Sequence, residues 1–230
     1  MIHRFLRSPW LCFVALAGGL LLSAESAAAQ RGAILGDVPT QPRADARYLI
    51  YLHGRIVEEQ GPRPTDERFG PYEYQQILDT LAASGAEVVA EVRPKGTDFR
   101  AFGARVADQV RRLLAAGVPA EQIAVVGFSK GGAIAIVASA LLADSRVSFV
   151  FLGACGDWVK GRDDVDVRGR ILSIYEASDE LGTSCDPLFA QASAQGAHRE
   201  VRITTGAGHG AFYRPRSEWL VPLFGWIERR

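Results

Sequence analysis

The sequence predicts a three-layer α/β/α sandwich built on a mostly parallel sheet. Short runs that are apolar at every position alternate along the chain with segments whose apolar residues recur at helical spacing. This alternation is typical of strands buried on both faces and of the helices that cover them. The chain has 230 residues, of which 48% are hydrophobic, and this suits one domain with a single large core.

The N-terminal segment, residues 1–29, is expected to be a signal peptide. A basic start precedes an apolar run from Trp10 to Leu22, and small residues ending at Ala29 follow it. The run is shorter than the roughly 20 apolar residues that span a bilayer. An uncleaved membrane anchor is the alternative. We expect cleavage before Gln30, a periplasmic or secreted mature protein, and no stable membrane anchor afterwards.

The first half of the domain begins after an irregular lead-in over residues 30–46, and the domain itself covers residues 47–230. Residues 48–52 form an apolar, aromatic-rich run that predicts a buried strand. A polar loop with prolines, residues 55–70, follows. Apolar residues at helical spacing then predict a helix from Tyr74 that ends near Ser84.

The second half continues the alternation of strands and helices. A helix capped by Thr97 or Asp98 carries one apolar stripe and stops at Gly117. The remaining predicted strands cover residues 87–92, 122–127, 147–153, 170–176 and 200–204, and the remaining predicted helices cover residues 130–143, 186–195 and 215–227. In such a sheet the ligand site lies beyond the carboxyl ends of the strands, so reactive residues are expected just after strands.

Ser129 is the candidate nucleophile, because it lies between a predicted strand and a predicted helix within a Gly-x-Ser-x-Gly pattern. Gly127 and Gly131 leave room for the sharp turn that would expose its hydroxyl. The pattern alone is weak, since it arises by chance, and its position after a strand strengthens it. The backbone N–H of Lys130 would point from the helix N-terminus toward negative charge that develops near the serine.

A serine hydroxyl needs a base, and His209 is the candidate base because it follows the last predicted strand in a glycine-rich loop. His198 lies at the opposite end of that strand and is expected at the surface. His53 is expected to hydrogen-bond locally and to shape its loop. A second backbone N–H for an oxyanion comes from Arg55, or from Gly54, just after the first strand.

The base in turn needs a carboxylate, and Asp179 is the candidate because it follows the strand at residues 170–176. Glu180 and Asp186 are neighbouring alternatives. No metal-binding cluster, phosphate-binding loop or nucleotide fingerprint occurs, so no cofactor and no metal is expected. Lys and Arg total 26, and so do Asp and Glu, so the charge favours no nucleic-acid partner.

With these residues in place, the chain resembles the α/β-hydrolase superfamily, in particular its small members of dienelactone-hydrolase or carboxylesterase type. The resemblance covers nearly all of the mature chain, and the order Ser129, Asp179, His209 is the order of that superfamily. It implies an eight-stranded, mostly parallel plan, of which the first one or two strands could be absent here. Dienelactone hydrolases carry cysteine at the nucleophile position, whereas this chain carries serine. No insertion has the length of a large lid, and residues 55–70 could cover part of the site.

The resemblance also bears on the two cysteines of the mature chain, Cys155 and Cys185. An exported chain with an even number of cysteines favours a disulfide, and two buried free thiols are the alternative. The superfamily places the two strands that precede these cysteines side by side. The resemblance therefore implies a Cys155–Cys185 bridge that would brace the loop with Asp179.

The sequence and the resemblance together predict an exported serine hydrolase that cleaves carboxylic esters of small molecules through an acyl-enzyme. A peptidase or acyltransferase with the same triad is one alternative, and a non-catalytic binding protein is another. Basic residues near the strand ends could attract an anionic substrate, and aromatic residues there could line an acyl pocket, although solvated surface charge and packing under loops explain them equally well. The candidates for substrate binding are Arg93, Lys95, Trp158 and Phe212.

Overall fold

The computed structural model describes residue 1 and residues 31–142, 146–159, 162, 165–192 and 197–228. The expected signal peptide therefore lies outside the described residues, apart from Met1. Within the described ranges, no helix combines the length and the apolar character that crossing a bilayer requires.

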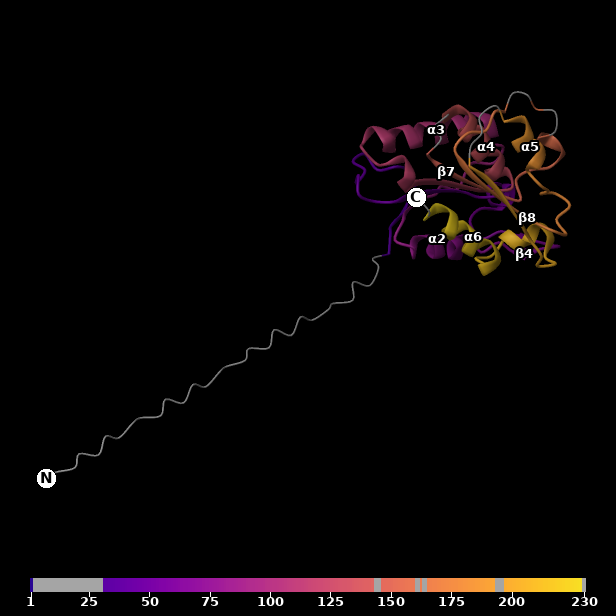
Figure 1. The fold of residues 1–230 in the computed structure, drawn as a ribbon. Helices are drawn as coiled ribbons and strands as arrows, with labels where there is room; N and C mark the ends of the chain where they lie inside the picture. The colour runs from indigo at the N-terminus through magenta and orange to yellow at the C-terminus, as the bar shows by residue number, and fades with distance from the viewer. Residues whose placement is uncertain (2–30, 143–145, 160–161, 163–164, 193–196, 229–230) are drawn as a thin grey trace.

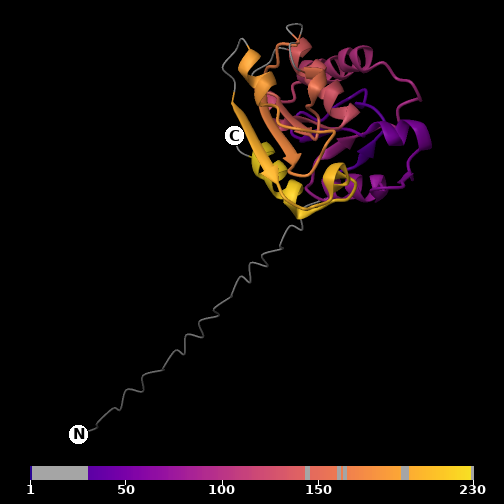
Figure 2. The same cartoon turned by 90° about the vertical axis from the view of Figure 1, so that its right-hand side faces the viewer.

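The main sheet has seven strands, and every pair of neighbours is parallel. In spatial order the strands are β1 (Ile34–Leu35), β5 (Glu87–Val89), β2 (Tyr48–Leu52), β6 (Ile123–Phe128), β7 (Ser148–Leu152), β8 (Arg170–Glu176) and β9 (His198–Ile203). A two-stranded antiparallel hairpin, β3 (Thr65–Asp66) and β4 (Gly70–Pro71), lies outside this sheet. Figure 2 shows the late strands along one side of the sheet and the early strands along the other.

Helices cover both faces of the sheet, which gives the predicted three layers (Figure 1). One face carries α3 (Phe99–Ala115), α4 (Lys130–Leu142) and α5 (Asp186–Gln191), and the other carries α2 (Tyr74–Ala82) and α6 (Ser217–Ile227). A short helix α1 (Arg55–Gln60) and three 3₁₀ turns, η1 (Ala120–Gln122), η2 (Asp157–Val159) and η3 (Gly208–Phe212), complete the fold.

The core consists of two apolar clusters, one on each face of the sheet. Strand β7 shows why, because side chains alternate between the faces of a strand. Phe149 and Phe151 enter the cluster under α3 and α4, whereas Val150 and Leu152 enter the cluster on the side of α2 and α6. A strand in this position is covered on both faces, and all five residues of β7 are buried, four of them apolar.

Most predicted elements are present, and their ends are the main differences. Residues 30–46 were expected to be irregular, but Ile34–Leu35 pairs with β5 as an edge strand. Two residues are too few to show the alternation that marks a strand. The expected loop over residues 55–70 begins with helix α1 instead, and β9 starts two residues earlier than predicted, at His198.

Candidate active site

Ser129 follows β6 and directly precedes α4. In this turn, neighbouring backbone segments pack closely against Gly127 and Gly131. Its φ angle is 54°, and it is the only residue other than glycine with positive φ in the described ranges. A Cβ on Gly131 would lie 2.0 Å from the carbonyl oxygen of Leu52, and a Cβ on Gly127 would lie 2.2 Å from the carbonyl oxygen of Gly131. The two glycines therefore permit a strained turn that keeps the Ser129 side chain partly exposed.

His209 lies in η3, beyond the end of β9, and is hydrogen-bonded to Asp179. Its Nδ1 is 2.7 Å from Asp179 Oδ2, while Asp179 Oδ1 accepts a 2.8 Å hydrogen bond from the Leu181 backbone N–H. The Asp179 side chain is fully buried and that of His209 is 7% exposed. Because a carboxylate can only accept, the proton of the neutral imidazole sits on Nδ1, and Nε2 keeps a free lone pair.

A chain of contacts joins Ser129 to this pair. The ring of Phe128, the residue before Ser129, lies 4.7 Å from the His209 ring, centroid to centroid. The Ser129 N–H donates to Leu152 O at 3.0 Å, and a Cβ on the next residue, Gly153, would lie 3.3 Å from Asp179 Oδ2. Within the described residues no hydrogen bond joins Ser129 to His209; such contacts are commonly long without substrate and shorten in the complex.

Glu176, at the end of β8, ties the loops of Asp179 and His209 together. Its carboxylate accepts hydrogen bonds from the N–H and hydroxyl of Ser178 at 2.6 and 2.5 Å, and from the N–H groups of Thr205 and Gly206 at 2.8 and 3.0 Å. Burial alone would raise the pKa of Glu176, but these hydrogen bonds lower it to about 2. Sequence analysis missed this role, although a carboxylate that ends an apolar strand was a usable signal.

The two candidate amides for an oxyanion both belong to helix N-termini. Arg55 is the first residue of α1 and Lys130 is the first of α4, so neither N–H has an acceptor within its own helix. A Cβ on Gly54 would lie 3.7 Å from Ser129 Cβ, which places the start of α1 beside the serine. Both helix ends therefore direct positive partial charge toward the same region.

His53 shapes the loop that leads into α1, as its sequence context suggested. Its Nε2 accepts from the Arg93 backbone N–H at 3.0 Å, so its Nδ1 donates to Gly54 O at 2.8 Å. Burial, together with the nearby charge of Arg93, lowers the pKa of His53 to about 3. The ring is therefore neutral at physiological pH and is fully buried.

Solved structures with the same arrangement of strands and helices are numerous. SOBER1 from Arabidopsis thaliana superposes with a TM-score of 0.55 at 15% identity, over 80% of this chain and 98% of that one. Esterase PE8 superposes with a TM-score of 0.54 at 15% identity, over 84% of this chain and 95% of that one. The chain has the α/β-hydrolase fold. At this level of identity the likeness concerns the fold alone.

A third structure of this α/β-hydrolase fold, a thermostable esterase, superposes with a TM-score of 0.51 at 17% identity. The match covers 82% of this chain and 57% of that esterase, so this chain spans little more than half of its length. No family model and no curated protein matches the sequence.

Arg93 and Lys95, two candidates for substrate binding, lie in different environments. Lys95 is exposed on the loop after β5. The Arg93 side chain is 1% exposed, and its Nε donates to Glu58 Oε1 at 2.8 Å. Because the guanidinium is inside the protein and paired, we assign Arg93 to the support of the His53 loop rather than to substrate binding. Burial lowers its pKa, and the pairing with Glu58 opposes that effect.

Of the two aromatic candidates for an acyl pocket, Phe212 is buried and Trp158 is half-buried. Phe212 is 1% exposed, ends the 3₁₀ turn that contains His209, and lies 5.4 Å from Phe128, centroid to centroid. Trp158 is half-buried, donates from Nε1 to Ala154 O at 2.9 Å, and packs edge-on against Phe99. Both positions correspond to packing under loops, the alternative that the sequence left open.

Cys155 and Cys185 form the expected disulfide, with their Cα atoms 5.2 Å apart. Beside it, the Thr183 N–H donates to Cys155 O at 2.7 Å. A Cβ on Gly182 would lie 2.5 Å from Gly153 O. The loop that carries Asp179 is thereby fixed to the end of β7 at several points.

The hairpin of β3 and β4 lies against the loop of His209. The Phe69 ring is 6.4 Å from the His209 ring, centroid to centroid, and a Cβ on Gly210 would lie 2.7 Å from Phe69 Cβ. Arg68 Nη1 donates to Glu180 Oε2 at 3.1 Å across the surface. These contacts come from residues 55–70, the segment for which partial cover of the site was expected.

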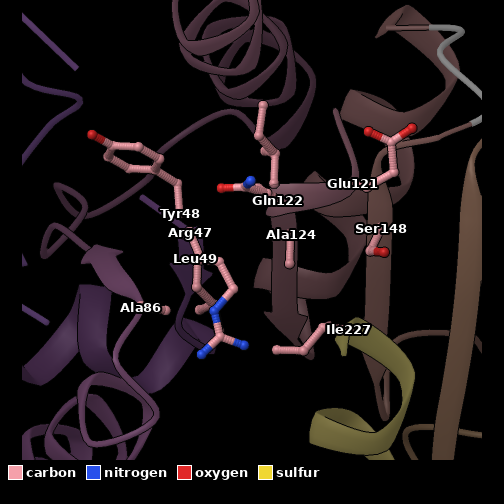
Figure 3. Close-up of a pocket in the computed structure, with 10 residues that line it drawn as sticks. Arg47, Tyr48, Leu49, Ala86, Glu121, Gln122, Ala124, Ser148 and Ile227 are labelled. Atoms are coloured by element: carbon pink, nitrogen blue, oxygen red, sulfur yellow. The ribbon is translucent and has the colours of Figure 1, made fainter. Parts of the chain in front are cut away.

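A hollow of about 20 Å³ lies at the opposite edge of the sheet (Figure 3). Its lining includes Tyr48, Ile123 and Ser148, the first residues of β2, β6 and β7. A space of this size holds about one water molecule. Because it lies at the first residues of these strands, it is separate from the candidate site, which lies beyond their carboxyl ends. Within the described ranges, no three histidine, cysteine or acidic side chains gather as a metal site would require.

Proposed function

We propose that this protein is an exported serine hydrolase that cleaves carboxylic esters of small molecules. Ser129 is the nucleophile, His209 is the general base, and Asp179 orients the imidazole. The backbone N–H groups of Lys130 and Arg55 hold the oxyanion. No cofactor takes part in this reaction.

In this mechanism the free lone pair of His209 Nε2 accepts the proton of the Ser129 hydroxyl as the oxygen attacks the ester carbonyl. The tetrahedral oxyanion then receives hydrogen bonds from the two helix-end amides. His209 returns the proton to the departing alcohol, which leaves an acyl-enzyme on Ser129. A water molecule attacks this acyl group by the same proton route, and the carboxylic acid and free serine are released.

The observation that carries the proposal is the 2.7 Å hydrogen bond between His209 Nδ1 and a fully buried Asp179 carboxylate, next to a strained serine. This bond fixes the tautomer that a general base needs. A serine with φ of 54° at a strand end is an uncommon conformation that persists where the surrounding structure enforces it. The preference for esters rests on the esterases among the structural neighbours.

Export is supported by the disulfide, because disulfides form and persist in oxidising compartments. The basic and apolar start of the sequence adds to this support. A periplasmic or secreted location follows from the proposal. N-terminal sequencing of protein recovered from the periplasm or medium tests it, and a chain that still carries its first 29 residues would contradict cleavage.

The deciding experiment combines a fluorophosphonate probe with an ester screen. The wild-type protein is expected to be labelled and to hydrolyse short-chain nitrophenyl esters, whereas Ser129→Ala loses both, with turnover falling by roughly 10⁴- to 10⁶-fold. Ser217→Ala, which alters an exposed serine at the start of α6, serves as the matched control and keeps both.

The same assay separates the competing functions. A folded protein that is neither labelled nor active would support a non-catalytic binding protein. Labelling without ester turnover, together with cleavage of peptides or transfer to amine acceptors, would support a peptidase or an acyltransferase. Either result would overturn the ester proposal.

A further inference from the structure

Three charged side chains meet inside the protein beside the candidate oxyanion site. Glu58 Oε1 accepts from Arg93 Nε at 2.8 Å, and Glu58 Oε2 accepts from Lys130 Nζ at 2.6 Å. The side chains of Glu58 and Arg93 are each 1% exposed, and that of Lys130 is 16% exposed. One buried anion is thus shared between two cations, and the mechanism above uses none of the three side chains.

Each member of this cluster comes from a segment that positions an oxyanion donor. Glu58 lies in α1, one turn after the Arg55 amide. Lys130 follows Ser129 and supplies the other amide. Arg93 donates from Nη2 to the His53 carbonyl and from its backbone N–H to the His53 ring, so it fixes the residues that lead into α1. The cluster therefore connects the two halves of the oxyanion site.

Stability alone is a poor explanation for this cluster. Removing charges from water is costly, and a buried ion pair is often no more stabilising than apolar side chains of the same size. Such a cluster fixes the relative positions of its members. A carboxylate whose two oxygens accept hydrogen bonds from two cations has little freedom to move. Donors held in place before the reaction stabilise a developing oxyanion without reorganising during it.

We propose that Glu58 is a positioning residue for the oxyanion site. By bridging Lys130 to Arg93, it keeps the amide of Lys130 and the amide of Arg55 at a fixed separation. This inference rests on the proposed function, since it assigns a role in the same reaction. Glu58 touches no reacting atom and acts through the two helix ends.

The variant Glu58→Gln tests this role, because it keeps the shape of the side chain and removes the charge that holds both cations. We expect kcat for a short-chain nitrophenyl ester to fall roughly 10- to 100-fold, up to the loss of one oxyanion donor. The KM is expected to stay unchanged, because the lost interaction forms only in the transition state. The inhibition constant of an alkylboronic acid, which forms a tetrahedral adduct on Ser129, is expected to rise by the same factor.

Three further variants separate a positioning role from a general loss of stability. Lys130→Met removes one bridge and leaves the Glu58–Arg93 pair intact, so it tests the role should Glu58→Gln not fold, and it is expected to show the same split between kcat and KM. Leu113→Ala deletes buried side-chain volume in α3, away from the site. It is expected to lower Tm without changing kcat or boronate inhibition. Lys130→Arg, which keeps the cation, is expected to restore most of the activity lost in Lys130→Met.

The outcomes distinguish this inference from the proposed function. If the wild-type protein shows neither ester turnover nor labelling of Ser129, the proposed function fails and the inference falls with it. If the wild-type protein is active but the folded Glu58 and Lys130 variants keep kcat and boronate inhibition within about twofold, the proposed function stands and the positioning role is wrong. A kcat loss in Leu113→Ala equal to that in Glu58→Gln would also overturn it.

Discussion

At the scale of single residues, orientation matters as much as identity. Asp179 uses one oxygen for the Leu181 N–H and the other for His209, so its carboxylate cannot rotate without losing a hydrogen bond. Glu176 accepts four hydrogen bonds from two loops and thereby connects the loop of Asp179 to the loop of His209. The candidate triad therefore depends on carboxylates that never contact a substrate.

The variant Asp179→Asn tests the tautomer. The Leu181 N–H keeps the side-chain oxygen on its own side, so the new amide NH₂ faces His209 Nδ1 and the ring proton moves to Nε2. Without a free lone pair on Nε2, kcat is expected to fall roughly 10⁴-fold, with little change in Tm. Steady-state kinetics measure this, and Glu180→Gln, at an exposed neighbour, is the control. A loss below about tenfold would argue against Asp179 as the orienting acid.

Glu176 predicts a pH dependence of stability. Its pKa is lowered from an ordinary value of 4.5 to about 2, so the folded state binds this proton more weakly than the unfolded state. The contribution is fully present above pH 4.5 and is lost as the pH falls toward 2. Urea unfolding between pH 6 and pH 2 is expected to show a weaker decline in Glu176→Gln than in the wild type. Parallel curves for the two proteins would contradict this prediction.

The sequence named candidates for the site by their position just after a strand, and their catalytic roles stay predictions. Ser129, Asp179 and His209 each follow a strand, and the structure brings the segments that carry them to one region. Arg93 also follows a strand, but its side chain turns inward to Glu58. The sequence does not reveal that the Arg93 side chain is buried, because its burial depends on Glu58, which lies 35 positions earlier in the chain.

At the scale of elements, the turn between β6 and α4 is fixed by backbone contacts that exclude any side chain. The variant Gly131→Ala would place a methyl group 2.0 Å from Leu52 O, where only backbone movement could relieve it. We expect a loss of about 3 kcal/mol or more in the free energy of unfolding, together with loss of turnover. Gly36→Ala is the matched control, since a Cβ there meets nothing within 4 Å. Equal stability of the two variants would refute the packing argument.

The disulfide closes a loop of 30 residues that contains Asp179. Chain entropy predicts that the double variant Cys155→Ala and Cys185→Ala loses about 3–4 kcal/mol of unfolding free energy. Because Glu176 still anchors the Asp179 loop, the folded variant is expected to keep its turnover rate. Urea titration measures the first quantity and initial rates measure the second. An unchanged unfolding midpoint would show that the bridge does not restrain the unfolded chain.

Elements with a strong pattern were predicted well, and those held only by tertiary contacts were not. Strand β8 has the predicted bounds, since seven residues of mostly apolar chain are unambiguous. Helix α1 was missed, because it has only six residues and its buried positions, Val57 and Glu58, do not form an apolar stripe. Its tertiary contacts are the packing of Val57 in the core and the hydrogen bonds of Glu58 to Arg93 and Lys130, which lie far away in the sequence.

At the scale of the whole molecule, the two core clusters lie on opposite faces of one sheet. We therefore expect them to unfold together. Trp158 packs against one cluster, while Trp219 and Trp226 are buried in the other. We expect far-UV circular dichroism, tryptophan fluorescence and ester turnover to be lost at the same urea concentration. In the chain without residues 1–29, Trp158→Phe leaves only Trp219 and Trp226, so its fluorescence reports the α6 side. The fluorescence midpoint of this variant is expected to coincide with its own circular dichroism midpoint. Separate midpoints would mean that the two faces unfold independently.

The candidate triad is also spread over the last part of the chain, with Ser129 after β6, Asp179 after β8 and His209 after β9, the final strand of the sheet. No nascent chain shorter than 209 residues can therefore carry out the proposed reaction, however well its early strands have assembled. Parallel sheets of this kind close through distant pairings that form slowly. During refolding, the return of enzymatic rate is thus expected to lag behind the return of helical signal, so catalysis itself reports the final stage of assembly.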